Sequence, residues 1–222
     1  MNQLFVKICG MTRPQDAELA ASLGASAVGF VFWPGSPRSV SAATAKAIAA
    51  SVPANVLKVG VFVDQPATDI TRIMDEAGLD VAQLHGRESP EYCRQLMARL
   101  NADAAEADGS PAYPSKRTIF KAVAPENGSV NIDDVDPEII LLVDAHDPER
   151  FGGTGKTVNW DSAREIAATR RTILAGGLNA ANIQLAVRTV RPYGVDVSSG
   201  VESAPGIKDP SRLRSFFEAL HD

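Results

Sequence analysis

The sequence of 222 residues predicts one α/β domain spanning 1–222, folded as a (β/α)8 barrel. Three observations lead to this prediction. Short apolar runs alternate with helical patterns along the whole chain, eight such runs can be counted, and a glycine turn follows each of the last two. An open doubly wound sheet is the alternative, but paired glycine turns at units seven and eight favour a closed barrel.

The expected strands lie at about 4–9, 27–32, 57–63, 80–85, 118–123, 139–144, 171–175 and 194–198. The expected helices lie near 14–23, 42–51, 67–77, 88–100, 160–168, 180–190 and 210–220. Pro14 and Ser41 are helix-start signals, Asp209 precedes the last helix, and Gly78 is a C-terminal stop signal. Only the fifth crossover, 124–137, has a poor helical pattern.

Composition and charge limit the function classes. The net charge of −5, with no basic tract, argues against a nucleic-acid or anionic-membrane partner. No apolar run is long enough for a membrane span and no signal-peptide pattern is visible, so we expect a cytoplasmic protein, either a monomer or a homodimer. Cys9 and Cys93 form no CxxC motif, and three histidines give no zinc-ligand spacing, so no bound metal is expected.

The segment 101–116 is polar, rich in small residues and interrupted by proline. It follows a helix and precedes a strand, which places it on the face of the barrel opposite the catalytic one. We therefore expect an exposed loop insertion that tolerates deletion.

The glycine turns after the last two strands predict a phosphate site. Gly176 and Gly177 end the first turn, and Ser198, Ser199 and Gly200 repeat the arrangement one unit later. Glycine lets the backbone approach a ligand closely, and free N–H groups at helix N-termini bind dianions. Asn179 is expected to cap a helix beginning at 180. Ordinary strand-to-helix turns are the alternative.

Cys9 is a candidate catalytic residue at the end of the first strand. Strand alternation places Phe5, Lys7 and Cys9 inside the barrel, with Cys9 uppermost. The Lys7 ammonium two residues below is expected to favour the thiolate. A free cysteine is also commonly a small buried hydrophobe, and Cys93 is assigned that packing role.

Asp144 ends the otherwise apolar sixth strand and shares a face with Ile140 and Leu142. Partial burial is expected to raise the pKa of this carboxyl group, which suits a general acid, although a capping role is also open. The glycine-rich stretch 147–156 that follows is long enough to fold over a ligand, and its likeness to a P-loop is superficial.

Three further polar residues lie at expected strand ends. Arg38, after the second strand, could clamp a carboxylate with its two-pronged guanidinium, or it could be solvated. Asp196 shares a face with Ser198 in the eighth strand, and His85 ends the fourth strand. Asp196 or Ser198 could contact a sugar hydroxyl, whereas a structural role is also open for His85.

Together, the motifs resemble those of the phosphoribosylanthranilate isomerase family in order and at successive strand ends. They are Lys7-Ile-Cys-Gly10, Val28-Gly-Phe-Val-Phe32 with Ser36-Pro-Arg38, Gln83-Leu-His-Gly86, Leu142-Val-Asp144 with 152–156, Gly176-Gly-Leu178 and Asp196-Val-Ser-Ser-Gly200. The resemblance implies a cofactor-free Amadori rearrangement of N-(5-phosphoribosyl)anthranilate in tryptophan biosynthesis, giving 1-(2-carboxyphenylamino)-1-deoxyribulose 5-phosphate.

The resemblance also implies residue roles. Cys9 would be the general base, Asp144 the general acid and Arg38 the anthranilate clamp, with the phosphate at Gly176, Gly177 and the Ser199-Gly200 turn.

Three alternative functions would also use the predicted phosphate site. A metal-dependent pentose-phosphate epimerase needs several His and Asp ligands, and an indole-glycerol-phosphate synthase needs a catalytic Lys and Glu set; neither can be assembled from this sequence. A non-catalytic phosphosugar-binding barrel is the third, and the presence of both Cys9 and Asp144 at strand ends argues against it.

Overall fold

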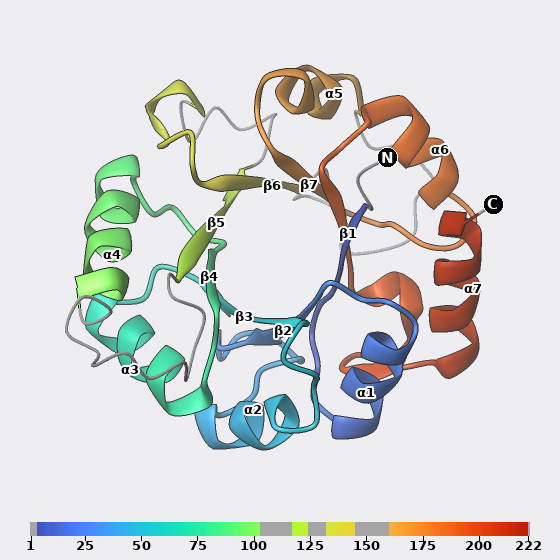
Figure 1. The fold of residues 1–222 in the computed structure, drawn as a ribbon, viewed down its shortest axis with the longest axis horizontal. Coiled ribbons are helices and arrows are strands. Elements are labelled where there is room, and N and C mark those ends of the chain that lie inside the picture. The colour runs from blue at the N-terminus through green and yellow to red at the C-terminus, as the bar shows by residue number, and fades with distance from the viewer. Residues whose placement is uncertain (1–3, 103–116, 124–131, 145–159, 222) are drawn as a thin grey trace.

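A computed structural model describes residues 4–102, 117–123, 132–144 and 160–221, and it contains a closed barrel of eight parallel strands. Each strand pairs with the next, and the eighth pairs with the first, which closes the barrel (Figure 1). In this last pairing Lys7 lies opposite Asp196. The strands are β1 (Phe5–Ile8), β2 (Ala27–Val31), β3 (Leu57–Phe62), β4 (Val81–Leu84), β5 (Thr118–Val123), β6 (Ile140–Asp144), β7 (Thr172–Ala175) and β8 (Gly194–Val197). The predicted barrel is confirmed, and the open sheet is excluded.

A ring of helices surrounds the barrel (Figure 1). These are α1 (Pro14–Ser22), α2 (Ala42–Ala49), α3 (Ala67–Ala77), α4 (Pro90–Ala102), α5 (Trp160–Thr169), α6 (Ile183–Val190) and α7 (Pro210–His221). Between β5 and β6 the described residues contain only the 3-10 turn η2 (Ile132–Asp134), in keeping with the poor helical pattern there. Residues 101 and 102 of the expected 101–116 loop belong instead to α4, whereas 103–116 and the glycine-rich stretch 147–156 lie outside the described residues.

The predicted helix signals act as expected at three positions. The Ser41 hydroxyl accepts a hydrogen bond from the Thr44 N–H at 3.0 Å and caps α2. Gly78 ends α3 in the left-handed conformation, with φ of +66°. The Asp209 carboxylate accepts from the N–H groups of Ser211 and Arg212 at the start of α7.

The helix after β7 begins later than predicted. The Asn179 side chain accepts from the Ala181 N–H, and the Asn182 side chain accepts from the Asn179 N–H, both at 2.9 Å. These two bonds close a turn, so α6 starts at Ile183 rather than at 180. A hairpin after β8, formed by β9 (Glu202–Ala204) and β10 (Ile207–Lys208), was not predicted.

Strand alternation divides the core into two shells. Seven buried apolar side chains fill the barrel interior: Ala27, Val59, Val81, Phe120, Leu142, Ile173 and Ala175. A larger cluster, which includes Val6 and Ile8, lies between the strands and the helices. Lys7 is therefore enclosed by the barrel, as its place in β1 predicted, and has no exposed surface. Because all eight strands run in one direction, their carboxyl ends form one rim.

Candidate active site

The rim opens into a cavity of about 330 Å³. It brings together every predicted site residue except Lys7, namely Cys9, Arg38, His85, Asp144, Gly176, Gly177, Asp196, Ser198, Ser199 and Gly200. Lys7 lies one layer below, inside the barrel. The cavity is thus lined by residues of β2, β3, β4, β6, β7 and β8 and by residues that directly follow β1, β2, β3, β4, β7 and β8.

Cys9, Lys7 and Asp196 form a buried cluster at the β1–β8 seam. The Lys7 ammonium donates to the Asp196 carboxylate at 2.9 Å. Both Lys7 and Cys9 pack against Gly29 of β2: a Cβ on this glycine would meet the Cys9 sulfur at 2.8 Å and the Lys7 Nζ at 3.2 Å. The missing side chain at position 29 is therefore what lets the thiol and the ammonium lie side by side.

Burial raises the pKa of the Cys9 thiol, and Asp196 raises it further. The Lys7 and Lys208 ammonium groups lower it, but they do not outweigh these effects. Lys7 therefore favours the thiolate, as expected, but the net effect of the surroundings is a raised pKa of Cys9. Burial also disfavours the charged form of Lys7, but Asp196 and Cys9 overcome that effect and raise the pKa of this ammonium, so it stays charged.

Asp144 lies across the rim, next to His85. The His85 Nε2 is 3.5 Å from the Asp144 carboxylate, whose side chain is 32% exposed. The Gln83 amide Nε2 lies 3.1 Å from His85 Nδ1 and can only donate to it. This contact orients the imidazole so that its Nε2 faces Asp144. His85 therefore lies in the cavity with a contact to the predicted acid, and the raised pKa of Asp144 stays a prediction.

Arg38 does not present its whole guanidinium to the cavity. Its Nε donates to the Glu202 carboxylate at 2.9 Å and its Nη2 donates at 2.6 Å. Burial raises the pKa of Glu202, but hydrogen bonds from Arg38 and Lys208 more than offset that and hold it below its usual range. One edge of the Arg38 fork is thus bound within the protein, and Nη1 is the nitrogen left for a ligand among the contacts of the described residues.

Two buried acceptor atoms on the cavity wall have no partner among the described residues. They are Asp196 Oδ1 and Gln83 Oε1, and both residues line the cavity. A buried acceptor without a partner costs free energy that a ligand hydroxyl can recover. These two atoms mark where a polyhydroxylated ligand can donate hydrogen bonds.

The two glycine turns meet at the rim, as predicted. Gly176 and Gly177 have positive φ angles, +89° and +64°. A Cβ on Gly200 would overlap the carbonyl of Leu178, so the turn after β8 packs directly on the turn after β7. The second turn opens the single 3-10 turn η3 (Ser199–Val201) instead of an α-helix. Paired backbone turns of this kind, at units seven and eight of a barrel, are typical of phosphate sites.

Glu202 and Lys208 are the site residues that the sequence reasoning missed. Both belong to the β9–β10 hairpin, and both are buried. The signal that could have found them is the Pro205-Gly206 pair, which is typical of a tight turn. A turn there brings the two flanking charges together after β8.

Among the described residues, no cluster of three His, Cys, Asp or Glu side chains could hold a metal ion. In the same part of the chain, no helix has the length and apolar character needed to cross a membrane.

Comparison with known proteins agrees with the geometry. Residues 6–219 match the family described as N-(5'phosphoribosyl)anthranilate (PRA) isomerase. An N-(5'-phosphoribosyl)anthranilate isomerase of Pelobacter propionicus is 44% identical over 211 residues, which cover 95% of this chain and 92% of that protein.

Solved structures agree as well. Phosphoribosyl anthranilate isomerase from Thermotoga maritima superposes with a TM-score of 0.81 at 36% identity, covering 99% of each chain. A phosphoribosyl anthranilate isomerase in complex with reduced 1-(o-carboxyphenylamino)-1-deoxyribulose 5-phosphate gives 0.78 at 33% identity, with the same coverage. The chain belongs to the phosphoribosylanthranilate isomerase family.

Proposed function

We propose that the rim site converts N-(5'-phosphoribosyl)anthranilate into 1-(2-carboxyphenylamino)-1-deoxyribulose 5-phosphate, with Cys9 as the general base and Asp144 as the general acid. The observation that carries this proposal is the single cavity that Cys9, Asp144 and both glycine turns line. It offers two proton-transfer groups on separate strands and an anchor for a phosphate ester.

The reaction needs two proton transfers at different atoms. Asp144 donates a proton to the ribose ring oxygen as the bond from that oxygen to C1′ breaks, which leaves a protonated Schiff base. Cys9, as thiolate, removes the proton from C2′, and the electron pair neutralises the Schiff base to give an enolamine. The enolamine then gains a proton at C1′ from the Cys9 thiol, while its C2′ hydroxyl gives its proton to the Asp144 carboxylate and becomes the ketone. Both residues return to their starting forms and no net electrons are transferred, so no redox cofactor is needed.

The remaining residues of the site bind the substrate. The backbone at Gly176, Gly177 and Gly200, with the Ser198 and Ser199 turn, holds the phosphate, and Arg38 binds the anthranilate carboxylate through Nη1.

His85 and Asp196 contact sugar hydroxyl groups. The unpartnered Oδ1 of Asp196 supports this role. Lys7 pairs with Asp196 at 2.9 Å and favours the thiolate of Cys9.

Because the net charge is −5, local groups must hold the small anionic substrate, and this charge does not favour a nucleic-acid or membrane partner. We propose that 1–222 acts as one catalytic domain. Monomer and homodimer stay equally open, and sedimentation of the purified protein distinguishes them. The cytoplasmic location stays a prediction.

Turnover followed by the fluorescence of phosphoribosylanthranilate tests the proposal. The wild type should consume this substrate, whereas Cys9→Ala and Asp144→Asn should each lose at least about a hundredfold in kcat, the usual contribution of a general acid or base. Cys93→Ala is the matched control, because this buried thiol lies on α4. Near-normal turnover by Cys9→Ala would remove the base from the scheme, and wild-type binding without turnover would favour a phosphosugar-binding barrel.

A further inference from the structure

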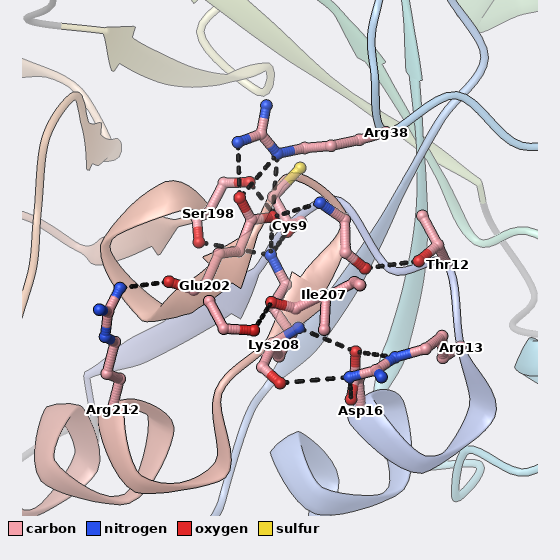
Figure 2. Close-up of polar contacts among 12 residues, drawn as sticks. Cys9, Thr12, Arg13, Asp16, Arg38, Ser198, Glu202, Ile207, Lys208 and Arg212 are labelled. Atoms are coloured by element: carbon pink, nitrogen blue, oxygen red, sulfur yellow. Dashed lines mark hydrogen bonds and ion pairs between the residues drawn. The ribbon is translucent and has the colours of Figure 1, made fainter. Parts of the chain in front are cut away.

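The β9–β10 hairpin places two buried charged side chains, Glu202 and Lys208, directly behind the rim site (Figure 2). Only 5% of Glu202 and 1% of Lys208 is exposed. The proton transfers proposed above use neither residue. Burying two charges is costly unless each is well paired, so their contacts show what they support.

Glu202 fixes the orientation of Arg38. Its carboxylate accepts from Nη2 at 2.6 Å and from Nε at 2.9 Å, a two-pronged contact that sets the guanidinium plane as well as its position. Arg38 lines the cavity, and its side chain is 22% exposed. The edge of Arg38 that remains available to a ligand is therefore defined by Glu202.

Lys208 ties Glu202 to the peptide of Cys9. An ammonium has three N–H groups, and the contacts of Lys208 account for all of them. They go to Glu202 at 2.8 Å, to the Cys9 carbonyl at 2.5 Å and to the Ser198 carbonyl at 3.3 Å. The Cys9 N–H donates to the Val197 carbonyl at 2.8 Å. The N–H and the carbonyl group of Cys9 are thus both hydrogen-bonded, one to the end of β8 and the other to the hairpin.

We propose that Glu202 and Lys208 are positioning residues for the isomerisation: Glu202 aims Arg38 at the substrate carboxylate, and Lys208 holds Cys9 where its sulfur meets the substrate. This inference rests on the proposed roles of Arg38 and Cys9. It assigns the hairpin two separable effects, because a carboxylate clamp governs substrate affinity, whereas a displaced base slows only the chemical step.

The opposite side of the same hairpin supplies a control. Asp16 accepts from the backbone N–H of Lys208 at 3.0 Å, and Arg13 binds Asp16 at 2.7 Å and donates to the Lys208 carbonyl (Figure 2). These contacts anchor the hairpin backbone to the start of α1, and they involve neither Arg38 nor the Cys9 carbonyl. Asp16→Asn therefore perturbs the hairpin while both side-chain contacts stay intact.

The first experiment compares steady-state constants and melting temperatures of three variants. Glu202→Gln should raise KM about tenfold with kcat within about twofold of wild type, the pattern of lost uniform binding. Lys208→Met should lower kcat about ten- to hundredfold, because small displacements of a reacting group are expensive. Asp16→Asn should change neither constant by more than about twofold. If Lys208→Met does not fold, Lys208→Gln carries the same test.

The second experiment measures binding alone. The ligands are reduced 1-(o-carboxyphenylamino)-1-deoxyribulose 5-phosphate and its anilino counterpart without the carboxylate. Glu202→Gln and Arg38→Lys should each weaken the carboxylate ligand about tenfold and leave the anilino ligand unchanged. The double variant should lose no more than Arg38→Lys alone, because Glu202 acts through Arg38.

Each contrary result has a distinct meaning. If Arg38→Lys binds the carboxylate ligand normally, the clamp in the proposed function fails, and the role of Glu202 fails with it. If Arg38→Lys weakens binding but Glu202→Gln does not, only the positioning role is overturned. A third result would overturn the inference. If kcat and KM change in proportion to the loss of melting temperature in all three variants, Glu202→Gln, Lys208→Met and Asp16→Asn, the hairpin has only a structural role.

Discussion

Replacing Lys7 by Met should move the pH dependence of turnover upward. The Cys9 sulfur and the Lys7 Nζ lie within 2.8 Å and 3.2 Å of one point, the site of a Cβ on Gly29, so the two atoms are at most about 6 Å apart. At that greatest separation and an effective dielectric constant of about 20, a unit charge contributes about 3 kcal/mol, and a shorter distance gives more. Removing the Lys7 ammonium should therefore raise the already elevated pKa of Cys9 further.

The sign follows from the role of the base. Only the thiolate removes a proton, so kcat/KM rises with pH until the pH passes the pKa of Cys9. In Lys7→Met this limb should lie at higher pH, which lowers kcat/KM at pH 7 by about a hundredfold, the factor that corresponds to about 3 kcal/mol. The two profiles should converge at high pH.

The single substitution also leaves Asp196 as an unpaired buried carboxylate, at a cost of about 3–5 kcal/mol. Lys7→Met/Asp196→Asn removes both charges and is the control for folding, checked by urea unfolding. A thiol-alkylation titration of Cys9 in Cys93→Ala backgrounds reads the same pKa without turnover. An unchanged pH limb in Lys7→Met, with the protein folded, would refute the electrostatic role assigned to Lys7.

Three other perturbations test separate parts of the structure. Gly200→Ala forces a Cβ against the Leu178 carbonyl, so inhibition by inorganic phosphate should weaken about tenfold or more; an unchanged inhibition constant would place the phosphate elsewhere. Phe216→Ala removes a fully buried ring on α7 and should lower the free energy of unfolding by about 3–5 kcal/mol in urea titrations, with smaller losses showing that the site collapses readily.

The pKa of Glu202 is held low in the fold, so its stabilising effect is present above its unfolded pKa of about 4.3 and is lost as pH falls through the folded pKa. Glu202→Gln should flatten the acid limb of a stability profile, and an identical limb would show that other carboxylates cause it.

The architecture was predictable because each barrel unit carries local signals. Alternation in β1 placed Lys7 inside and Cys9 at the rim, and both placements are confirmed. The paired glycine turns identified the last two units of the barrel. Gly200 lies so close to the Leu178 carbonyl that any side chain at this position would overlap it.

The sequence was less informative where a contact joins distant segments. Arg38 and Glu202 are 164 residues apart, so no local pattern predicts that one edge of the guanidinium is hydrogen-bonded to the Glu202 carboxylate. The pKa of Cys9 depends on the balance between burial and three neighbouring charges, which strand position alone cannot give. The helix α6 starts later than predicted because the side chains of Asn179 and Asn182 accept hydrogen bonds from backbone N–H groups and form a turn in place of the first helical residues.

The most direct test of the account is a crystal structure of this chain with reduced 1-(o-carboxyphenylamino)-1-deoxyribulose 5-phosphate. The account predicts the ligand phosphate on Gly176, Gly177 and Gly200, and C2′ within about 3.5 Å of the Cys9 sulfur. It predicts the oxygen that closes the ribose ring within about 3.2 Å of the Asp144 carboxylate. A ligand whose C2′ faces away from Cys9, or whose phosphate lies off the glycine turns, would contradict it.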